Sequence, residues 1–376
     1  MSQGINYDKD TKVISAVIVD TSAFLVANSD FLGVNSQLLP SFFAAIKEKG
    51  ITLLTHPILE NEIIKHLPDS SLVRNYNEFI SYVERCEKIL KYSDSYNIDF
   101  FNQLKAIDVR GKLHERYIEN FSSAEYLKYP SAEVVFKKYF ESQPPFTDCG
   151  KKKAEFPDAF IIASIVEYLN EHQFDILLVV SGDKDWEKSL SKIERVVFCE
   201  RIDKALKCIN SIESIISDEM INYILNAVEQ ELKRDVIFHL ECECYDVPDY
   251  EFIDSFEMKN VTVKMVDDFV PLKISRNELL IKIGMCLDVS GSGRIFDEEN
   301  SIWDSVDRCY FVKAYAELSV FKGEAYVEAE VVLGYDFDNP YDAMVSNIKL
   351  IVDGNINVEP VEYNLGPVEY EGEIIK

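Results

Sequence analysis

The sequence predicts an α/β domain with a mostly parallel sheet, followed by a β-rich domain that forms a sandwich or barrel. Short β-branched or apolar runs alternate with helical stretches up to about residue 235. From residue 236 onwards, strand-length runs follow one another and are separated by Gly, Asn, Asp and Pro. Alternation of strands and helices is typical of parallel sheets, whereas successive strands joined by turn residues are typical of antiparallel ones.

Four short runs in the first domain have the length and apolar content of buried strands. They lie at 13–19, 51–54, 176–180 and 195–198. Helical stretches separate these runs and end the domain, at 36–49, 57–67, 157–168 and from the last run to about 233. Pro57 and Pro157 stand at helix starts, where proline is favoured, and Gly50 ends the first of these helices.

A long helical insertion is expected from about residue 70 to 142. Apolar residues recur three and four positions apart in three segments, at 71–90, 99–121 and 131–140. The chain is therefore expected to comprise an α/β domain over 1–205, a helical connector over 206–235 and the β-rich domain over 236–376.

The charge of the chain excludes a protein that grips nucleic acid by a broad basic surface. The sequence has 39 Lys and Arg against 66 Asp and Glu, a formal net charge of -27. Residues 236–376 alone carry 29 acidic and 11 basic residues. Any binding of nucleic acid must therefore be local, assisted by metal ions, or helped by a partner.

Cysteine usage and hydropathy predict a cytoplasmic protein. The eight cysteines are dispersed and lack zinc-site spacing, so reduced thiols are the expected state. The first residues are polar without the apolar core of a signal peptide, and no apolar run has the length of a membrane span.

Four acidic phrases occur in order along the first domain: VIVDTSAF, HPILENEII, EFPDAFIIASI and VVSGDKDW. The ordered set resembles the PIN-domain nucleases, especially a larger bacterial PIN-like branch with a long helical insertion and a phrase like KxxEFPDAxIxxSI. The resemblance covers roughly residues 13–205 and implies a PIN-like parallel sheet flanked by helices. No single phrase is specific, but the four together, each in its expected strand or helix context, are.

The resemblance implies a set of catalytic and metal-binding acids, which fall on Asp20, Glu62, Asp158 and Asp183. Glu60 competes with Glu62, but Glu62 is favoured because apolar Ile63 follows it, as in the family. Ser181 matches the small hydroxyl partner, and Asp185 fits a further acid around the metal. In open α/β sheets, ligands bind beyond the carboxyl ends of the strands, where Asp20 and Asp183 both lie.

These residue types suit Mg²⁺ or Mn²⁺, which are hard ions that prefer carboxylate and water oxygens. One or two such ions, roughly 3.5–4 Å apart when paired, can neutralise a phosphodiester and activate water. The resemblance therefore implies a metal-dependent ribonuclease that cleaves internally, with single-stranded or structured RNA as substrate. By the same analogy its activity serves as a toxin or in phage defence. The β-rich domain would then bind a regulatory protein or recognise substrate.

Several alternatives stay open at this point. Each acid by itself is explained by a helix cap, a first helical turn or a loop. A PIN-fold interaction protein without activity is one alternative function. A haloacid-dehalogenase-like phosphatase is another, although that family has a second Asp where Ser22 stands. Lys153, in the run Lys151–Lys153, either steers phosphate or lies on a solvated loop. The inserted helices either cap the site, enlarge the core or form a homo-oligomer face.

Overall fold

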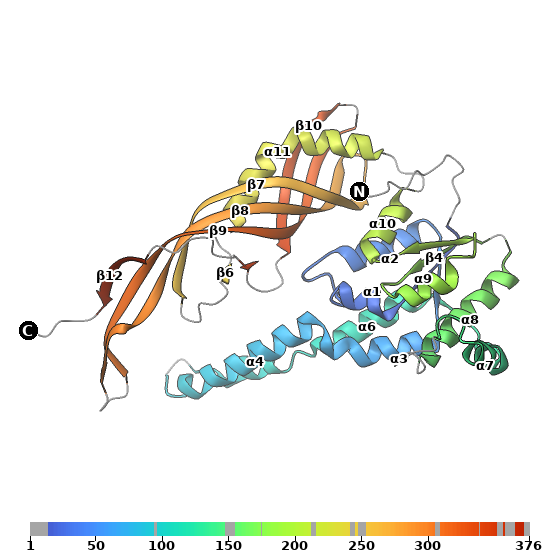
Figure 1. Cartoon of the computed structure of the whole chain (residues 1–376), viewed down its shortest axis with the longest axis horizontal. Coiled ribbons are helices and arrows are strands. Elements are labelled where there is room, and N and C mark those ends of the chain that lie inside the picture. The colour runs from blue at the N-terminus through green and yellow to red at the C-terminus, as the bar shows by residue number, and fades with distance from the viewer. Residues whose placement is uncertain are drawn as a thin grey trace, which may run out of the picture. The chain divides into compact units, whose positions relative to one another are not determined.

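The computed structural model forms two compact units, Met1–Ser214 and Ile215–Lys376, each described here by itself (Figure 1). The residues that the structure describes are 14–93, 96–146, 155–173, 175–211, 216–240, 245–246, 253–304, 309–337, 339–351, 356–357 and 365–371. Within these ranges, no helix combines the length and the apolar character that crossing a membrane requires.

The first unit is built on a five-stranded parallel sheet, as the alternation of strands and helices predicted. Its strand order is β3-β2-β1-β4-β5, and every neighbouring pair is parallel. The strands are β1 (Ala16–Val19), β2 (Thr52–Thr55), β3 (Glu125–Tyr126), β4 (Leu177–Val180) and β5 (Val196–Cys199). The two central strands, β1 and β4, are buried along their whole length, which explains their continuous apolar sequences.

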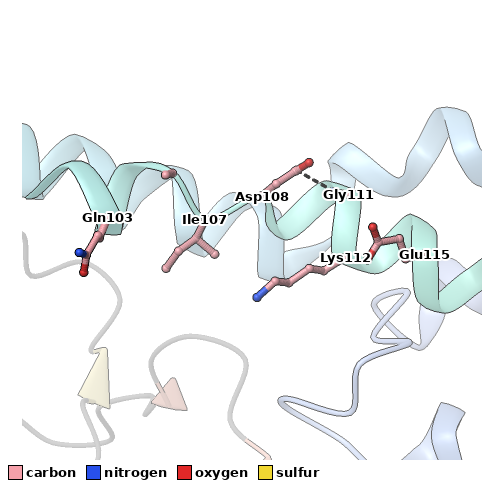
Figure 2. A pocket seen from close by; sticks show the side chains of 7 residues that line it. Gln103, Ile107, Asp108, Gly111, Lys112 and Glu115 are labelled. Carbon is pink, nitrogen blue, oxygen red and sulfur yellow. Dashed lines mark hydrogen bonds between the residues drawn. The ribbon is translucent and has the colours of Figure 1, made fainter. Parts of the chain in front are cut away.

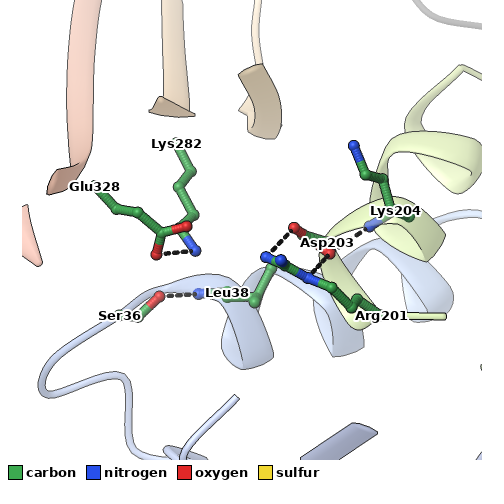
Figure 3. A network of polar contacts seen from close by, with 7 residues as sticks. All are labelled: Ser36, Leu38, Arg201, Asp203, Lys204, Lys282 and Glu328. Carbon is green, nitrogen blue, oxygen red and sulfur yellow. Dashed lines mark hydrogen bonds and ion pairs between the residues drawn. The ribbon is translucent and has the colours of Figure 1, made fainter. Parts of the chain in front are cut away.

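Helices cover the sheet and hold in place the edge at which its parallel strands end. They are α1 (Thr21–Val26), α2 (Leu38–Glu48), α3 (Pro57–His66), α8 (Phe156–Glu171), α9 (Lys184–Leu190) and α10 (Ile202–Asn210). One core joins alternate residues of the strands to α8 and α9, with Ile18, Val179 and Ile162 among its fully buried members. Helix α10 contacts β4, β5 and α2. At its start, Asp203 accepts hydrogen bonds from Arg201 Nε at 3.1 Å and Nη2 at 2.6 Å (Figure 3).

The insertion is helical, but it is divided more finely than predicted. It comprises the 3₁₀ turn Leu67–Asp69 and helices α4 (Ser71–Leu90), α5 (Ile98–Lys105), α6 (Val109–Phe121) and α7 (Ala132–Phe140). The segment expected as one helix over 99–121 breaks before α6, where Asp108 caps the new helix by accepting from the Gly111 amide at 2.7 Å. Figure 2 shows this cap in an open pocket of about 440 Å³.

The edge strand β3 and the attachment of α4 to α5 were not visible in the sequence. Strand β3 has only two residues, both exposed, so no apolar run signals it; pairing with β2 alone defines it. Near the end of α4, Glu87 accepts from Lys105 Nζ at 2.6 Å and from the Tyr96 hydroxyl at 2.7 Å. These contacts hold α5 and the preceding loop against α4.

The second unit is strand-rich, as predicted, but a helix forms its other layer. Its main antiparallel sheet has the order β10-β9-β8-β7, with β12 paired to β9. These strands are β7 (Ile253–Ile274), β8 (Glu278–Asp304), β9 (Cys309–Asp336), β10 (Asn339–Ile351) and β12 (Leu365–Glu371). A small pair joins β6 (Tyr245–Asp246) and β11 (Ile356–Asn357). Lys282 on β8 forms an ion pair with Glu328 on the neighbouring strand β9, at 2.6 Å (Figure 3).

Helix α11 (Asp218–Leu240) packs its apolar stripe on this sheet (Figure 1). Val228, Leu232 and Val236 lie in one buried core with strand residues such as Ile281 and Ile283. The region expected as a connector over 206–235 is therefore divided between the two units, because its second helix supplies the layer that a second sheet supplies in a sandwich.

A buried carboxylate organises the loop between α1 and α2. Asp30 is almost fully buried and accepts from the backbone amides of Val34 at 3.1 Å, Asn35 at 2.7 Å and Ser36 at 3.0 Å. Asp30→Ala should lower the free energy of unfolding by about 2–3 kcal/mol, because three backbone donors lose a charged acceptor. Denaturant unfolding measures this loss. Glu119→Ala, at an exposed ion pair of α6, should change stability by less than about 0.5 kcal/mol; equal losses in both variants would contradict the assignment.

Candidate active site

The site begins where β1 and β4 end side by side. The Asp20 amide donates to the Val180 carbonyl at 2.8 Å, and Ser181 follows β4 directly. Asp20 is only 6% exposed. Its Oδ2 accepts from the Ser181 hydroxyl at 2.8 Å and from the Ser22 hydroxyl. Two hydroxyls, one of them 161 positions away in sequence, therefore fix the carboxylate at the sheet edge.

Glu62 turns toward this edge from helix α3. The Thr21 hydroxyl donates to Glu62 Oε2 at 3.2 Å, and the charges of Asp20 and Asp158 act on the Glu62 carboxyl. Glu60 is engaged elsewhere: its Oε2 accepts from the Tyr126 hydroxyl at 3.0 Å. Glu62, and not Glu60, is therefore the acid of α3 whose carboxyl lies within range of the charges of Asp20 and Asp158.

Asp158 lies in the first turn of α8, directly after Pro157 in the sequence. The indole nitrogen Nε1 of Trp186 donates to Asp158 Oδ1 at 3.0 Å. Trp186 is fully buried on α9 and belongs to the core under the sheet edge. The core thus sets the direction of this carboxylate through a single hydrogen bond.

Asp183 and Asp185 occupy the start of α9 and differ in their surroundings. Asp183 caps the helix by accepting from the Asp185 amide at 2.7 Å, while its own amide donates to the Ser181 hydroxyl at 3.0 Å. Asp185 is buried, and its Oδ1 lies 3.3 Å from Lys188 Nζ. Lys188 therefore offsets the charge of Asp185 within the chain itself.

Burial is the main reason why three of these carboxyls have a pKa above the ordinary range. For Asp20, burial raises the pKa, the Ser22 and Ser181 hydroxyls lower it, and the charge of Asp183 raises it. For Asp158, burial raises the pKa, the Trp186 bond lowers it, and the charges of Asp20, Asp183 and Asp185 raise it. Burial also raises the pKa of Glu62. The mutual effects place the acids of all four sequence phrases within electrostatic range of one another.

A family model described as PIN domain matches residues 17–186. This region is a PIN domain. The match confirms the family resemblance drawn from the four acidic phrases, and PIN domains have a nuclease-type fold. Comparison with curated proteins and comparison with solved structures each gave no match.

The donor set of the PIN domain suits a hard divalent cation. It consists of carboxylate oxygens, and the charges of Asp20 and Asp158 act on Glu62, while that of Asp183 acts on Asp20 and Asp158. Within the described ranges, no three acidic, His or Cys side chains are arranged to hold one ion together. Mg²⁺ does not require such a cage, since it usually keeps several waters and takes one or two carboxylates.

Lys153 lies outside the described residues, so its predicted role stays a prediction. Sequence reasoning missed the positioning parts played by Thr21, Ser22 and Trp186. Each has a signal in the sequence, since Thr21 and Ser22 directly follow Asp20 and Trp186 ends the SGDKDW phrase.

The raised pKa values predict that the PIN domain gains stability when Asp158 loses its charge. A carboxyl whose pKa is higher in the folded state binds more protons there, so stability is greatest below its unfolded pKa of about 3.9 and falls as pH rises through the folded value. At pH 7, Asp158→Asn should therefore raise the free energy of unfolding, by up to about 1 kcal/mol for this half-buried group. The Asn oxygen still accepts from Trp186.

Denaturant unfolding in EDTA tests this prediction, with Asp99→Asn as the matched control. Asp99 also lies in the first turn of a helix, α5, but it is exposed. Its substitution should not stabilise the protein, because a first-turn acid favours the helix dipole. A loss of stability in Asp158→Asn equal to that of Asp99→Asn would show that charge repulsion at the edge is unimportant.

Proposed function

We propose that this protein is a metal-dependent ribonuclease that cuts RNA internally with Mg²⁺ or Mn²⁺. The proposal rests on one observation: carboxylates from four separate segments lie within electrostatic range of one another at one edge of a PIN-domain sheet, and burial and repulsion raise the pKa of three of them. A site in which several carboxylates repel one another favours a divalent cation.

The metal-binding carboxylates are Asp20, Glu62, Asp158 and Asp183. Hydroxyl and indole donors hold one oxygen of three of them, which orients the side chains before a substrate arrives. When bound, Mg²⁺ or Mn²⁺ offsets the charge of the phosphodiester and lowers the pKa of a water molecule. The charge of Asp185 raises the pKa of Asp158. Asp185, which pairs with Lys188, also helps to hold the cation.

The acidic second unit fits a regulatory protein partner better than RNA. Residues 236–376 carry 29 acidic against 11 basic residues, which repels a phosphate backbone. A role as a toxin or a phage-defence effector, held in check through this unit, rests on analogy with the PIN-domain family alone.

Incubation of the purified protein with RNA and with DNA, in Mg²⁺, Mn²⁺ or EDTA, tests the activity. RNA should be cleaved only with metal. Asp20→Asn and Glu62→Gln should each reduce cleavage about 100-fold or more, since direct ligands matter at least as much as the groups that orient them. Glu60→Gln is the matched control on the same helix and should retain activity.

Metal-dependent cleavage that persists in both site variants would overturn the assigned site. Absence of cleavage of every substrate would instead favour a non-catalytic PIN-fold interaction protein. Release of phosphate from small esters, with RNA left intact, would favour the phosphatase alternative.

Ser181 provides a pH test of the same mechanism. Its hydroxyl lowers the pKa of Asp20, so Ser181→Ala should raise that pKa further. The acid limb of the kcat/KM profile should then move to higher pH, because metal binding needs the ionised carboxylate. Activity should approach that of the unaltered protein at the alkaline end. An equal loss at every pH would show that Ser181 acts by some means other than the ionisation of Asp20.

A further inference from the structure

One segment of the insertion combines exposed aromatic rings with lysines. It runs from Tyr126 to Phe140, and we call it the aromatic segment. Four of its rings are markedly exposed: Tyr126 (50%), Tyr129 (58%), Phe136 (46%) and Phe140 (78%). Exposed rings of this size are costly in water, so their accumulation within 15 positions calls for a function.

The first half of the aromatic segment lies at the same sheet edge as the acids. Tyr126 is in register with Thr55 of the neighbouring strand β2, where that strand ends. The Tyr129 ring then packs edge-to-face on the ring of His56, with centroids 4.7 Å apart. His56 caps α3, the helix that carries Glu62. Tyr129 therefore lies beside the start of a helix that bears a candidate metal ligand.

The second half reaches the other helix of the site. Phe136, on α7, packs on Phe156 with ring centroids 5.5 Å apart. Phe156 is the first residue of α8, and Asp158 lies in the same turn. Phe140 stacks near Phe136, with centroids 6.4 Å apart and an interplanar angle of 27°. The exposed rings thus lie beside the starts of α3 and α8, the two helices that carry Glu62 and Asp158.

The charge of the aromatic segment is opposite to that of the chain. It contains three lysines, at 128, 137 and 138, against one acid, Glu133, in a protein of net charge -27. Lys137 is exposed, and Lys128 is exposed although it pairs with Glu171 at 3.3 Å. Cations placed between exposed rings suit a ligand that has both flat apolar faces and negative charges.

Single-stranded nucleic acid has this chemistry, because its bases are unstacked and its phosphates alternate with them. A duplex hides its base faces, so it cannot use the rings. A protein partner would bury a contiguous apolar patch, whereas here lysines stand between the rings along the sequence.

We propose that the aromatic segment is a binding track for single-stranded RNA, in which bases stack on Tyr129, Phe136 and Phe140 and lysines contact phosphates. The biological role of the track rests on the proposed ribonuclease function. In that function, the track guides an unpaired strand to the acidic edge. It also supplies the local positive charge that the chain as a whole lacks.

Fluorescence anisotropy with a fluorescein-labelled 15-nucleotide oligoadenylate tests the track on the full chain. EDTA prevents metal-dependent cleavage and removes metal-mediated binding. Phe140→Ala and Tyr129→Ala should each weaken binding by about 5-fold to 100-fold, as expected for loss of one stacked base. Phe140→Tyr and Tyr129→Phe keep the ring and should bind like the unaltered protein.

Tyr92→Ala is the matched control for ring removal, because Tyr92 is 92% exposed at the end of α4, away from the aromatic segment. It should leave affinity unchanged. Lys137→Ala should make the dependence of log affinity on log salt shallower by about 0.7, the value for one phosphate contact with a single strand. An oligoadenylate–oligouridylate duplex should compete poorly for binding.

The outcomes separate the track from the ribonuclease itself. Cleavage by the unaltered protein, together with equal affinity of the unaltered, Phe140→Ala and Tyr129→Ala proteins, would overturn the track and leave the ribonuclease standing. Ring-dependent binding without cleavage in any metal would support the track and overturn the ribonuclease. Equal weakening by Tyr92→Ala, or binding of duplex as tight as single strand, would also overturn the track.

Discussion

The parallel pairing of β1 with β4 is the contact on which the candidate site depends. Its register places Val19 opposite Val180, so that Asp20 and Ser181 emerge together at the edge. The hydrogen bond between their side chains exists only in this register. A slip by one residue would turn Asp20 to the other face of the sheet, because successive side chains alternate in direction. Every other group at the site is positioned relative to this pair.

The rest of the first unit can be understood as the support that such a site requires. Buried like charges lower stability, and hydroxyl and indole donors offset only part of that cost. The fully apolar central strands and the core formed with α8 and α9 stabilise the domain enough to tolerate it. Like charges are thus buried near one another at the sheet edge, where the chemistry is expected. The central strands and the core, by contrast, follow the usual rule that apolar side chains are buried.

Much of this arrangement could be predicted from the sequence because strong periodic signals encode it. The central strands are continuous apolar runs, and α4 matches the predicted segment 71–90 residue for residue. Strand β3 could not be predicted, because pairing with β2 and not apolar content defines it. The break before α6 depends on the Asp108 cap within an otherwise helical pattern.

For the site, the order of the acidic phrases predicted which segments converge. It could not predict that Trp186 orients Asp158, since that contact depends on where α9 lies relative to α8. The partition of residues 206–235 was likewise hidden. The apolar stripe of α11 indicates that this helix packs on an apolar surface, but it does not indicate to which unit that surface belongs.

The separation of 161 positions between Asp20 and Ser181 has a consequence for synthesis. A ribosome makes Asp20, Glu62 and Asp158 before β4 and Asp183, so a growing chain holds most of the acids before it holds the strand that gathers them. Closing so long a loop is entropically costly until the central pairing compensates for it. The edge is therefore completed late, and fragments that stop before β4 carry Asp20, Glu62 and Asp158 without an assembled site.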